Sequence, residues 1–165
     1  MNITAVCPGS FDPVTLGHLE IITRASKMFD KVIVVILPNY AKSSSFSAEE
    51  RVSFLRRATA GIPNVEIDWY DGLLAEYARQ KQAGAIVKGL RALSDFEYEF
   101  QMALANKRLN PGADTVFLTA SAENMYLSSS MVRQIAVNGG DISDFVPSEI
   151  LSDIKARLNK KENII

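Results

Sequence analysis

The sequence has few of the residues and patterns that mark several common classes of protein. Its single cysteine, Cys7, excludes an internal disulfide framework, and without a Cys/His cluster there is no zinc-finger pattern. No apolar run approaches the length that crosses a bilayer, and no signal-peptide pattern opens the chain. The net charge of −1 offers no surplus of positive charge for nucleic acid or a membrane surface. We therefore expect a cytoplasmic protein that binds small molecules.

Two familiar nucleotide-binding motifs are missing as well. The chain has no G-x-x-x-x-G-K-[ST] phosphate loop and no G-x-G-x-x-G after its first apolar run, so kinase and dinucleotide-dehydrogenase interpretations lose their main support. Cys7 would need a histidine partner to act as a nucleophile, and its place in an apolar run assigns it to the core. Asp12 is a single carboxylate and does not by itself make a metal site.

Five apolar, β-branched runs recur along the chain, and helix-length segments separate them. The runs cover residues 3–6, 32–37, 65–69, 85–87 and 115–118. They are continuous rather than alternating, as expected for parallel strands that helices cover on both faces. With 165 residues, of which 47% are hydrophobic, we expect residues 1–165 to form a single doubly wound α/β domain with a five-stranded parallel sheet.

Helical signals fill the segments between the runs. Ser47 and Glu50 form a capping box at the start of the second helix, and Gly139 ends the fifth. Further helices are expected at about 73–82, 95–109 and 128–137, and after Pro147. One apolar stripe in the fourth helix consists of Phe96, Phe100, Ala103 and Leu104.

The turn after the first run is suited to an anion. Gly9 and Gly17 permit close approach of a ligand to the backbone, Ser10 offers a hydroxyl, and the helix that follows points N–H groups at the turn. His18, the only histidine of the chain, falls in the first turn of that helix. The alternative is an ordinary connection between a strand and a helix, with a histidine on the surface.

Two cations close the fourth run. Lys88 and Arg91 flank a short segment that begins with a glycine, at the sheet edge where an open parallel sheet binds its ligands. We expect them to contact phosphate. The alternative is a structural ion pair between Lys88 and either Asp95 or Glu99.

Two more loops at the same edge carry candidate residues. Lys42 follows the second run, although a lone loop lysine is commonly a surface residue. Ser128, Ser129 and Ser130, with Arg133, follow the fifth run and offer hydroxyls and N–H groups at a helix start. The simpler interpretation is an N-cap, but a cap needs only one serine.

Taken together, these segments resemble the phosphopantetheine adenylyltransferase family. The resemblance rests on Ser-Phe-Asp-Pro at 10–13, Thr-Leu-Gly-His at 15–18, Lys-Gly-Leu-Arg at 88–91 and Ser-Ser-Ser-Met-Val-Arg at 128–133. The second and last resemble the T-x-G-H and S-S-S/T-x-x-R signatures of the wider nucleotidyltransferase superfamily. Gly-Leu-Arg-Ala at 89–92 and Asp-Phe-Glu-Tyr-Glu at 95–99 narrow the resemblance to the pantetheine branch.

The resemblance implies a Rossmann-like nucleotidyltransferase fold and a reversible reaction of coenzyme A biosynthesis. An adenylyl group would pass from ATP to 4′-phosphopantetheine, giving dephospho-coenzyme A and pyrophosphate, with Mg²⁺ held mainly by substrate phosphates and no metal ligands from the protein. Similar enzymes are homohexamers. The residues implied for phosphopantetheine are Ser10, Lys42, Leu74 and Lys88. Those implied for ATP are Ser10, Phe11, His18, Gly89, Leu90, Arg91, Glu99, Asn124, Met125, Tyr126, Leu127, Ser128, Ser129 and Ser130.

The implied chemistry needs no protein nucleophile. The attacking phosphate has a second pKa of about 6, so it is largely ionised at neutral pH and requires no general base. We expect His18 to donate a hydrogen bond to the α-phosphate, while Lys42, Lys88 and Arg91 offset the repulsion between the two substrates.

The chain departs from the family at three positions, and other functions stay open. Position 10 is often threonine, and Ser10 keeps the hydroxyl. Position 88 is usually arginine, and Asn124 stands where an aromatic residue is common, with Tyr126 as the nearby aromatic that could replace it. The alternatives are another nucleotidyltransferase, acting for example on nicotinate mononucleotide, and an ATP-binding regulatory module without turnover.

Overall fold

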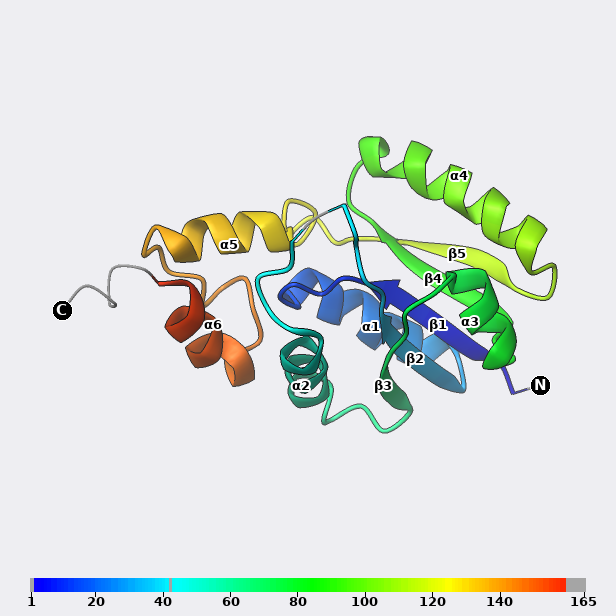
Figure 1. The fold of residues 1–165 in the computed structure, drawn as a ribbon, viewed down its shortest axis with the longest axis horizontal. Coiled ribbons are helices and arrows are strands. Elements are labelled where there is room, and N and C mark those ends of the chain that lie inside the picture. The colour runs from blue at the N-terminus through cyan, green and yellow to red at the C-terminus, as the bar shows by residue number, and fades with distance from the viewer. Residues whose placement is uncertain (1, 42, 160–165) are drawn as a thin grey trace.

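The computed structural model describes residues 2–41 and 43–159 and contains one five-stranded parallel sheet (Figure 1). The strands are β1 (Thr4–Gly9), β2 (Lys31–Ile36), β3 (Val65–Trp69), β4 (Ala85–Leu90) and β5 (Asp114–Thr119). Their order across the sheet is β3-β2-β1-β4-β5, and every neighbouring pair is parallel. The five expected runs are therefore the five strands, and the predicted α/β class is confirmed.

Helices cover both faces of the sheet. They are α1 (Leu16–Met28), α2 (Ala48–Ala58), α3 (Leu74–Gln80), α4 (Leu93–Leu109), α5 (Ser129–Val137), the short 3₁₀ helix η1 (Ser148–Ile150) and α6 (Leu151–Leu158). One buried cluster joins the sheet to α1, α2, α5 and α6, and a smaller cluster on the other face includes Tyr77 and Ala78 of α3. This arrangement is the doubly wound one that the sequence predicts.

Two strands run further than the sequence indicates. β1 continues to Gly9 through pairing with β2, and β4 continues to Leu90 through pairing with β5. Lys88 and Gly89 therefore lie inside a strand rather than after it. Pairing with the outer neighbours extends these strands although their sequences leave the apolar pattern.

Helix α4 presents much of its apolar surface to solvent. It begins at Leu93, two residues earlier than expected. In the predicted stripe, Phe96 and Phe100 are 39% and 45% exposed and Leu104 is 58% exposed, whereas Asn106 is the buried residue of the helix. The ring of Phe96 contacts Phe117 of β5, so the stripe rests on the sheet by one edge. A row of exposed aromatic and aliphatic side chains is typical of an interaction surface.

None of the helices within residues 2–41 and 43–159 has the length and apolar character needed to span a membrane. The cytoplasmic location expected from the sequence stays a prediction.

The sheet opens between its central strand, β1, and the neighbouring β4. β1 and β4 are paired at only two positions, Ala5 with Ala85 and Val6 with Ile86, while each remains paired with its outer neighbour to its end. Strand order reverses at this point, with β2 on one side and β5 on the other. Open α/β sheets bind their ligands in such a crevice, beyond the carboxyl ends of the strands.

Candidate active site

Two adjoining cavities occupy the crevice between β1 and β4. The first, of about 470 Å³, has among its walls most of the residues that the sequence assigns to ATP. These are Ser10, Phe11, His18, Gly89, Arg91, Glu99, Asn124, Leu127, Ser128, Ser129 and Ser130. The second, of about 530 Å³, includes Leu74. Because Ser10, Lys88 and Glu99 line both, the two cavities share a wall of polar side chains.

His18 is fixed in place by the start of helix α1. Thr15 is the N-cap, and its side-chain oxygen accepts a hydrogen bond from the His18 backbone N–H. In return the Thr15 backbone N–H donates to Nδ1 of His18 at 3.0 Å. Since Nδ1 accepts this bond, the ring proton of a neutral His18 resides on Nε2. The imidazole thus takes the place that Glu or Gln usually has in a capping box and keeps one N–H donor.

The environment of His18 keeps the imidazole neutral. Burial, together with the positive charges of Arg91 and Lys88, lowers its pKa from 6.5 to about 4. The ring lies edge to face with Phe11, at 5.1 Å between centroids. A neutral ring with a fixed tautomer can donate a hydrogen bond at pH 7 without first losing or gaining a proton. The surface-histidine alternative is therefore wrong.

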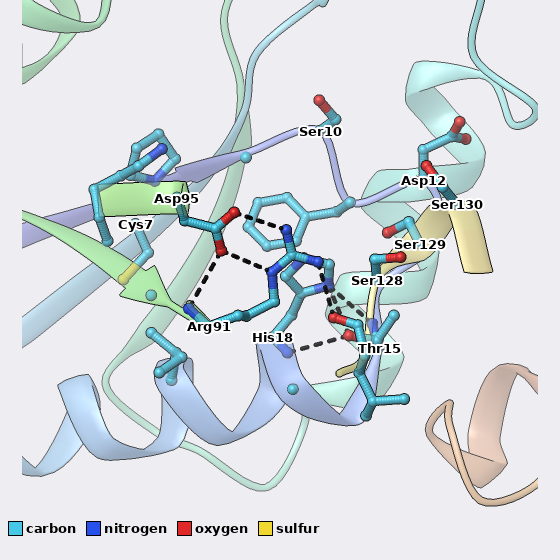
Figure 2. A pocket seen from close by; sticks show the side chains of 18 of the residues that line it. Cys7, Ser10, Asp12, Thr15, His18, Arg91, Asp95, Ser128, Ser129 and Ser130 are labelled. Atoms are coloured by element: carbon cyan, nitrogen blue, oxygen red, sulfur yellow. Dashed lines mark hydrogen bonds and ion pairs between the residues drawn. The ribbon is translucent and has the colours of Figure 1, made fainter. Parts of the chain in front are cut away.

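Both cations of the 88–91 segment are paired with carboxylates of helix α4. Lys88 Nζ lies 3.1 Å from Glu99. Arg91 Nε lies 3.1 Å from Asp95, as Figure 2 shows. The ion pair that the sequence allowed for Lys88 is thus present, and Arg91 has a similar pair one turn of α4 away. Phosphate contact by the two cations stays a prediction. The Arg91–Asp95 pair is the more exposed of the two, and exposed pairs contribute roughly 0.2–1 kcal/mol. A phosphate with a double charge can therefore compete for Arg91 at little cost.

The three serines at the start of helix α5 make different hydrogen bonds. Ser128 is the N-cap and accepts from the Met131 N–H at 3.1 Å. The Ser129 hydroxyl donates to the Pro13 carbonyl at 2.7 Å and so ties α5 to the turn after β1. Ser130 accepts a bond from Arg133 at 3.3 Å. One serine caps the helix, as the simpler interpretation requires, and the other two have separate partners at the cavity.

Asp12 and Arg51 hold the turn after β1 in place through hydrogen bonds. The sequence did not predict this structural role for either residue. The Asp12 carboxylate accepts from the backbone N–H groups of Ser45 and Phe46, both at 2.9 Å. The buried Arg51 donates to the Ser10 carbonyl at 2.8 Å. These contacts join the loop after β2 and helix α2 to the turn after β1, and no local pattern in the sequence signals a pairing 33 or more residues apart.

Three predicted ATP contacts line neither cavity. Met125 and Tyr126 lie on the outer side of their loop, 49% and 56% exposed, and the Tyr126 ring meets Phe145 edge-on. Tyr126 therefore does not take the place of an aromatic residue at position 124. The Leu90 carbonyl accepts from the Ala120 N–H and holds β4 to the segment after β5. The predicted site residue Lys42 lies outside the described residues.

Two of the glycines are explained by protein packing rather than by a ligand. A Cβ at Gly9 would lie 2.9 Å from the Phe11 ring, and one at Gly89 would lie 2.9 Å from Ile21 of α1. A Cβ at Gly17 would meet nothing closer than 3.6 Å. The N–H groups of Leu16 and His18 are already bonded, so Gly17 is the residue of the first turn through which α1 can meet an anion.

Cys7 lines the first cavity but has the properties of a core residue. It is 4% exposed, and burial raises the pKa of its thiol to about 12, although the charge of Lys88 acts in the opposite direction. A thiol with that pKa stays protonated at pH 7 and is a poor nucleophile. This confirms its assignment to the core.

The fold and the site together define a nucleotidyltransferase. A family model described as cytidylyltransferase-like matches residues 6–135, and the chain belongs to that family. The chain is 54% identical over 156 residues to the phosphopantetheine adenylyltransferase of Caldanaerobacter subterraneus subsp. tengcongensis, covering 94% of this chain and 98% of the relative. It is 52% identical over 162 residues to the phosphopantetheine adenylyltransferase of Clostridium botulinum strain 657, covering 98% of this chain and 99% of the relative. It is therefore a member of the phosphopantetheine adenylyltransferase family.

A solved structure supports the fold. A protein from Vibrio parahaemolyticus that is assigned as a nicotinate-nucleotide adenylyltransferase superposes with a TM-score of 0.66 at 20% identity, covering 96% of this chain and 98% of that one. At this identity the likeness concerns the fold alone, and it does not bear on the choice of substrate.

Proposed function

We propose that this chain transfers the adenylyl group of ATP reversibly to 4′-phosphopantetheine, forming dephospho-coenzyme A and pyrophosphate. The observation that carries the proposal is the pair of adjoining cavities with Ser10 and Lys88 in their common wall. A reaction between two phosphates needs two anion sites that meet at one polar boundary. Family membership, and relatives named for this activity at 52–54% identity, support the same assignment.

ATP is assigned to the first cavity and phosphopantetheine to the second. The first holds His18, Gly17 and the hydroxyls of the α5 start, which suit a triphosphate. The second has a more aliphatic wall, with Leu37, Leu74 and Met102, which suits an uncharged pantetheine arm. The phosphate of that arm would then lie at Lys88, where the two cavities meet.

The reaction forms one bond and breaks one. An oxygen of the phosphopantetheine phosphate bonds to the α-phosphorus of ATP, and the bond from that phosphorus to the bridging oxygen of pyrophosphate breaks. The attacking phosphate is largely ionised at neutral pH, because its second pKa is about 6, so no side chain has to remove a proton. His18 Nε2–H donates to an α-phosphate oxygen as negative charge grows there, and Lys88 and Arg91 reduce the repulsion between the substrates. Lys42 is assigned the same role as Lys88 and Arg91, which is to reduce the repulsion between the two substrates.

Mg²⁺ fits this site as a companion of the substrate. Among residues 2–41 and 43–159 there is no group of three or more His, Cys, Asp or Glu side chains that could hold a metal ion. The carboxylates nearest the cations, Asp95 and Glu99, are already paired. Oxygen ligands from ATP and pyrophosphate would therefore hold most of the ion, which would offset the charge of the leaving group.

We also propose that the chain forms a homo-oligomer, as the family resemblance implies. The exposed apolar side chains of α4 support this: Leu93 is 88% exposed and Leu104 is 58% exposed, in a helix whose buried residue is an asparagine. Packing against another copy of the chain would remove this surface from water.

A substrate panel tests the assignment. The protein is mixed with ATP and Mg²⁺ and with phosphopantetheine, nicotinate mononucleotide or an alcohol phosphate, and pyrophosphate release is measured. We expect release with phosphopantetheine. Pyrophosphate release only with nicotinate mononucleotide would indicate a nicotinate mononucleotide adenylyltransferase instead. ATP binding without pyrophosphate release for any acceptor would indicate a regulatory module.

A further inference from the structure

The carboxylate of Glu20 is the centre of a hydrogen-bond network that joins helix α1 to the segment after β5. Oε2 accepts from the Asn124 amide at 2.7 Å and from the Ser121 hydroxyl at 2.8 Å. Oε1 accepts from the Ser121 backbone N–H and from Arg24, both at 3.1 Å. The partners in the loop lie 101 and 104 residues away in sequence, so this contact is part of the tertiary structure and not of the helix alone.

The network sets the path of the loop that closes the first cavity. Arg24 also donates to the Thr119 carbonyl at 2.6 Å, so α1 holds the end of β5 as well as the loop. Beyond Asn124 the chain turns through a bond from the Leu127 N–H to the Asn124 carbonyl, at 3.0 Å. The Leu127 carbonyl in turn accepts from Arg91 at 3.2 Å. A continuous chain of contacts therefore runs from Glu20 to the cation at the end of β4.

The charge of Glu20 is what makes this anchor strong. Burial alone pushes its pKa upward, but hydrogen bonds from Asn124, Ser121 and Arg24 outweigh this and lower the pKa below its usual value. An ionised carboxylate only accepts, so the Asn124 amide must turn its NH₂ toward Glu20. Bonds to a charged acceptor are about twice as strong as neutral ones. The network therefore fixes both the position and the rotation of Asn124, which lines the cavity.

We propose that Glu20 is a positioning residue for the nucleotide: through Ser121 and Asn124 it holds the 120–127 loop at the distance from His18 that the ATP base and ribose require. His18 and Glu20 lie two residues apart on α1, so one helix carries the group that meets the α-phosphate and the anchor of the opposite wall. This inference rests on the proposed assignment of the first cavity to ATP. The ligand that Glu20 positions is a nucleoside triphosphate.

Replacing Glu20 by glutamine separates this positioning role from simple electrostatics, because the two predict opposite changes in KM for ATP. Glu20→Gln removes a negative charge near an anion site, which by itself favours ATP and lowers its KM. The same change replaces one carboxylate oxygen with an NH₂ group, which cannot accept from the Ser121 backbone N–H or from Arg24 on the Oε1 side. On the Oε2 side it can bond to Asn124 only if that amide turns over, so in either orientation the fixed geometry of the loop is lost. The positioning role therefore predicts a higher KM for ATP.

Glu123→Gln is the matched control. Glu123 is exposed in the same loop, next to Asn124, and the substitution changes the same charge without touching the network. Glu20→Asp keeps the charge on a shorter side chain, and partial rescue of ATP affinity by this variant would mark the carboxylate as the active feature.

The experiment measures KM for ATP, KM for phosphopantetheine and kcat for the wild type and the three variants, with direct ATP binding by calorimetry alongside. We expect Glu20→Gln to raise KM and Kd for ATP by about fivefold or more, with phosphopantetheine KM within about twofold and Glu123→Gln close to wild type. Equal effects of Glu20→Gln and Glu123→Gln, or a lower ATP KM in Glu20→Gln, would overturn the inference. A wild type that binds ATP but forms no product would refute the proposed function instead, and the calorimetric comparison would still decide on Glu20.

Discussion

The backbone N–H of Thr15 donates a hydrogen bond to Nδ1 of His18 at 3.0 Å, across the first turn of helix α1. This one contact caps the helix, fixes the tautomer of the only histidine in the chain and leaves Nε2–H as a donor. In the proposed mechanism, folding and catalysis use the two nitrogens of the same ring for different purposes.

Replacing His18 by alanine should lower kcat by roughly a hundredfold or more and leave KM for ATP nearly unchanged, because the donated bond strengthens only as charge develops in the transition state. Steady-state kinetics measures both quantities. The loss of the cap should also reduce the free energy of unfolding by about 0.5–2 kcal/mol. His18→Asn offers an acceptor for the Thr15 N–H and serves as the control for stability. Near-normal turnover in His18→Ala would remove the histidine from the mechanism.

The pKa of His18 should be near 4 in the protein without substrate, well below its ordinary value of 6.5. A single histidine gives a single imidazole C2–H resonance, so proton NMR reads this pKa directly. Because the folded pKa lies below the unfolded one, the neutral ring contributes stability that is fully present above pH 6.5 and is lost as the pH falls toward 4. Arg91→Ala should raise the pKa, since the positive charge of Arg91 lowers it. A resonance that titrates near 6.5 would contradict the buried, neutral ring.

Replacing Lys88 by alanine should raise KM for phosphopantetheine by about tenfold, since it removes a charged contact and leaves Glu99 without its partner. Lys88→Arg should keep the activity, because arginine retains the charge and adds a bidentate fork. Lys107→Ala removes a lysine that pairs with Asp114 on the surface, and it is the control for loss of charge alone. An unchanged phosphopantetheine KM in Lys88→Ala would count against the common wall as the phosphate site.

Two glycines should respond differently to alanine. At Gly89 a Cβ would lie 2.9 Å from Ile21, so Gly89→Ala should destabilise the protein by about 1–3 kcal/mol in chemical denaturation. At Gly17 the nearest atoms are 3.6 Å away, so Gly17→Ala should leave stability unchanged and raise KM for ATP instead. If Gly17→Ala binds ATP normally, the phosphates do not approach the first turn of α1.

The apolar face of α4 should control self-association. Leu104→Glu places a charge on that face and should shift the sedimentation profile toward smaller species, because burying a carboxylate at an apolar contact is costly. Met28→Glu makes the same change at a side chain that is 57% exposed on α1, on the other face of the sheet, and should leave the profile as in the wild type. A wild type that sediments as a monomer would contradict the oligomer.

The sheet could be predicted from the sequence because each strand is encoded locally, in a continuous run of β-branched residues, and helical segments separate the runs. It placed β3 at 65–69 and the end of α5 at 137, in agreement with the structure. It also brought Ser10, His18, Lys88 and the 128–130 serines to one edge, because the carboxyl ends of parallel strands share that edge.

What sequence reasoning missed depends on contacts between distant residues or on unusual chemistry at familiar positions. The capping rule looks for Glu or Gln at the third helical position, and His18 fills that position instead. Helical periodicity found the stripe of α4 but does not say whether the sheet, solvent or another chain covers it. The hydrogen bond between Glu20 and Asn124 spans 104 residues, and no local sequence pattern near either residue predicts it.

In the proposed reaction, two phosphates react across the common wall of the two cavities. The most direct measurement is to incubate the protein with ATP, Mg²⁺ and 4′-phosphopantetheine and to identify the products by mass spectrometry. We predict dephospho-coenzyme A and pyrophosphate in equal amounts, and ATP with phosphopantetheine again when the products are supplied in excess. No adenylylated product, or ADP in place of pyrophosphate, would contradict the account.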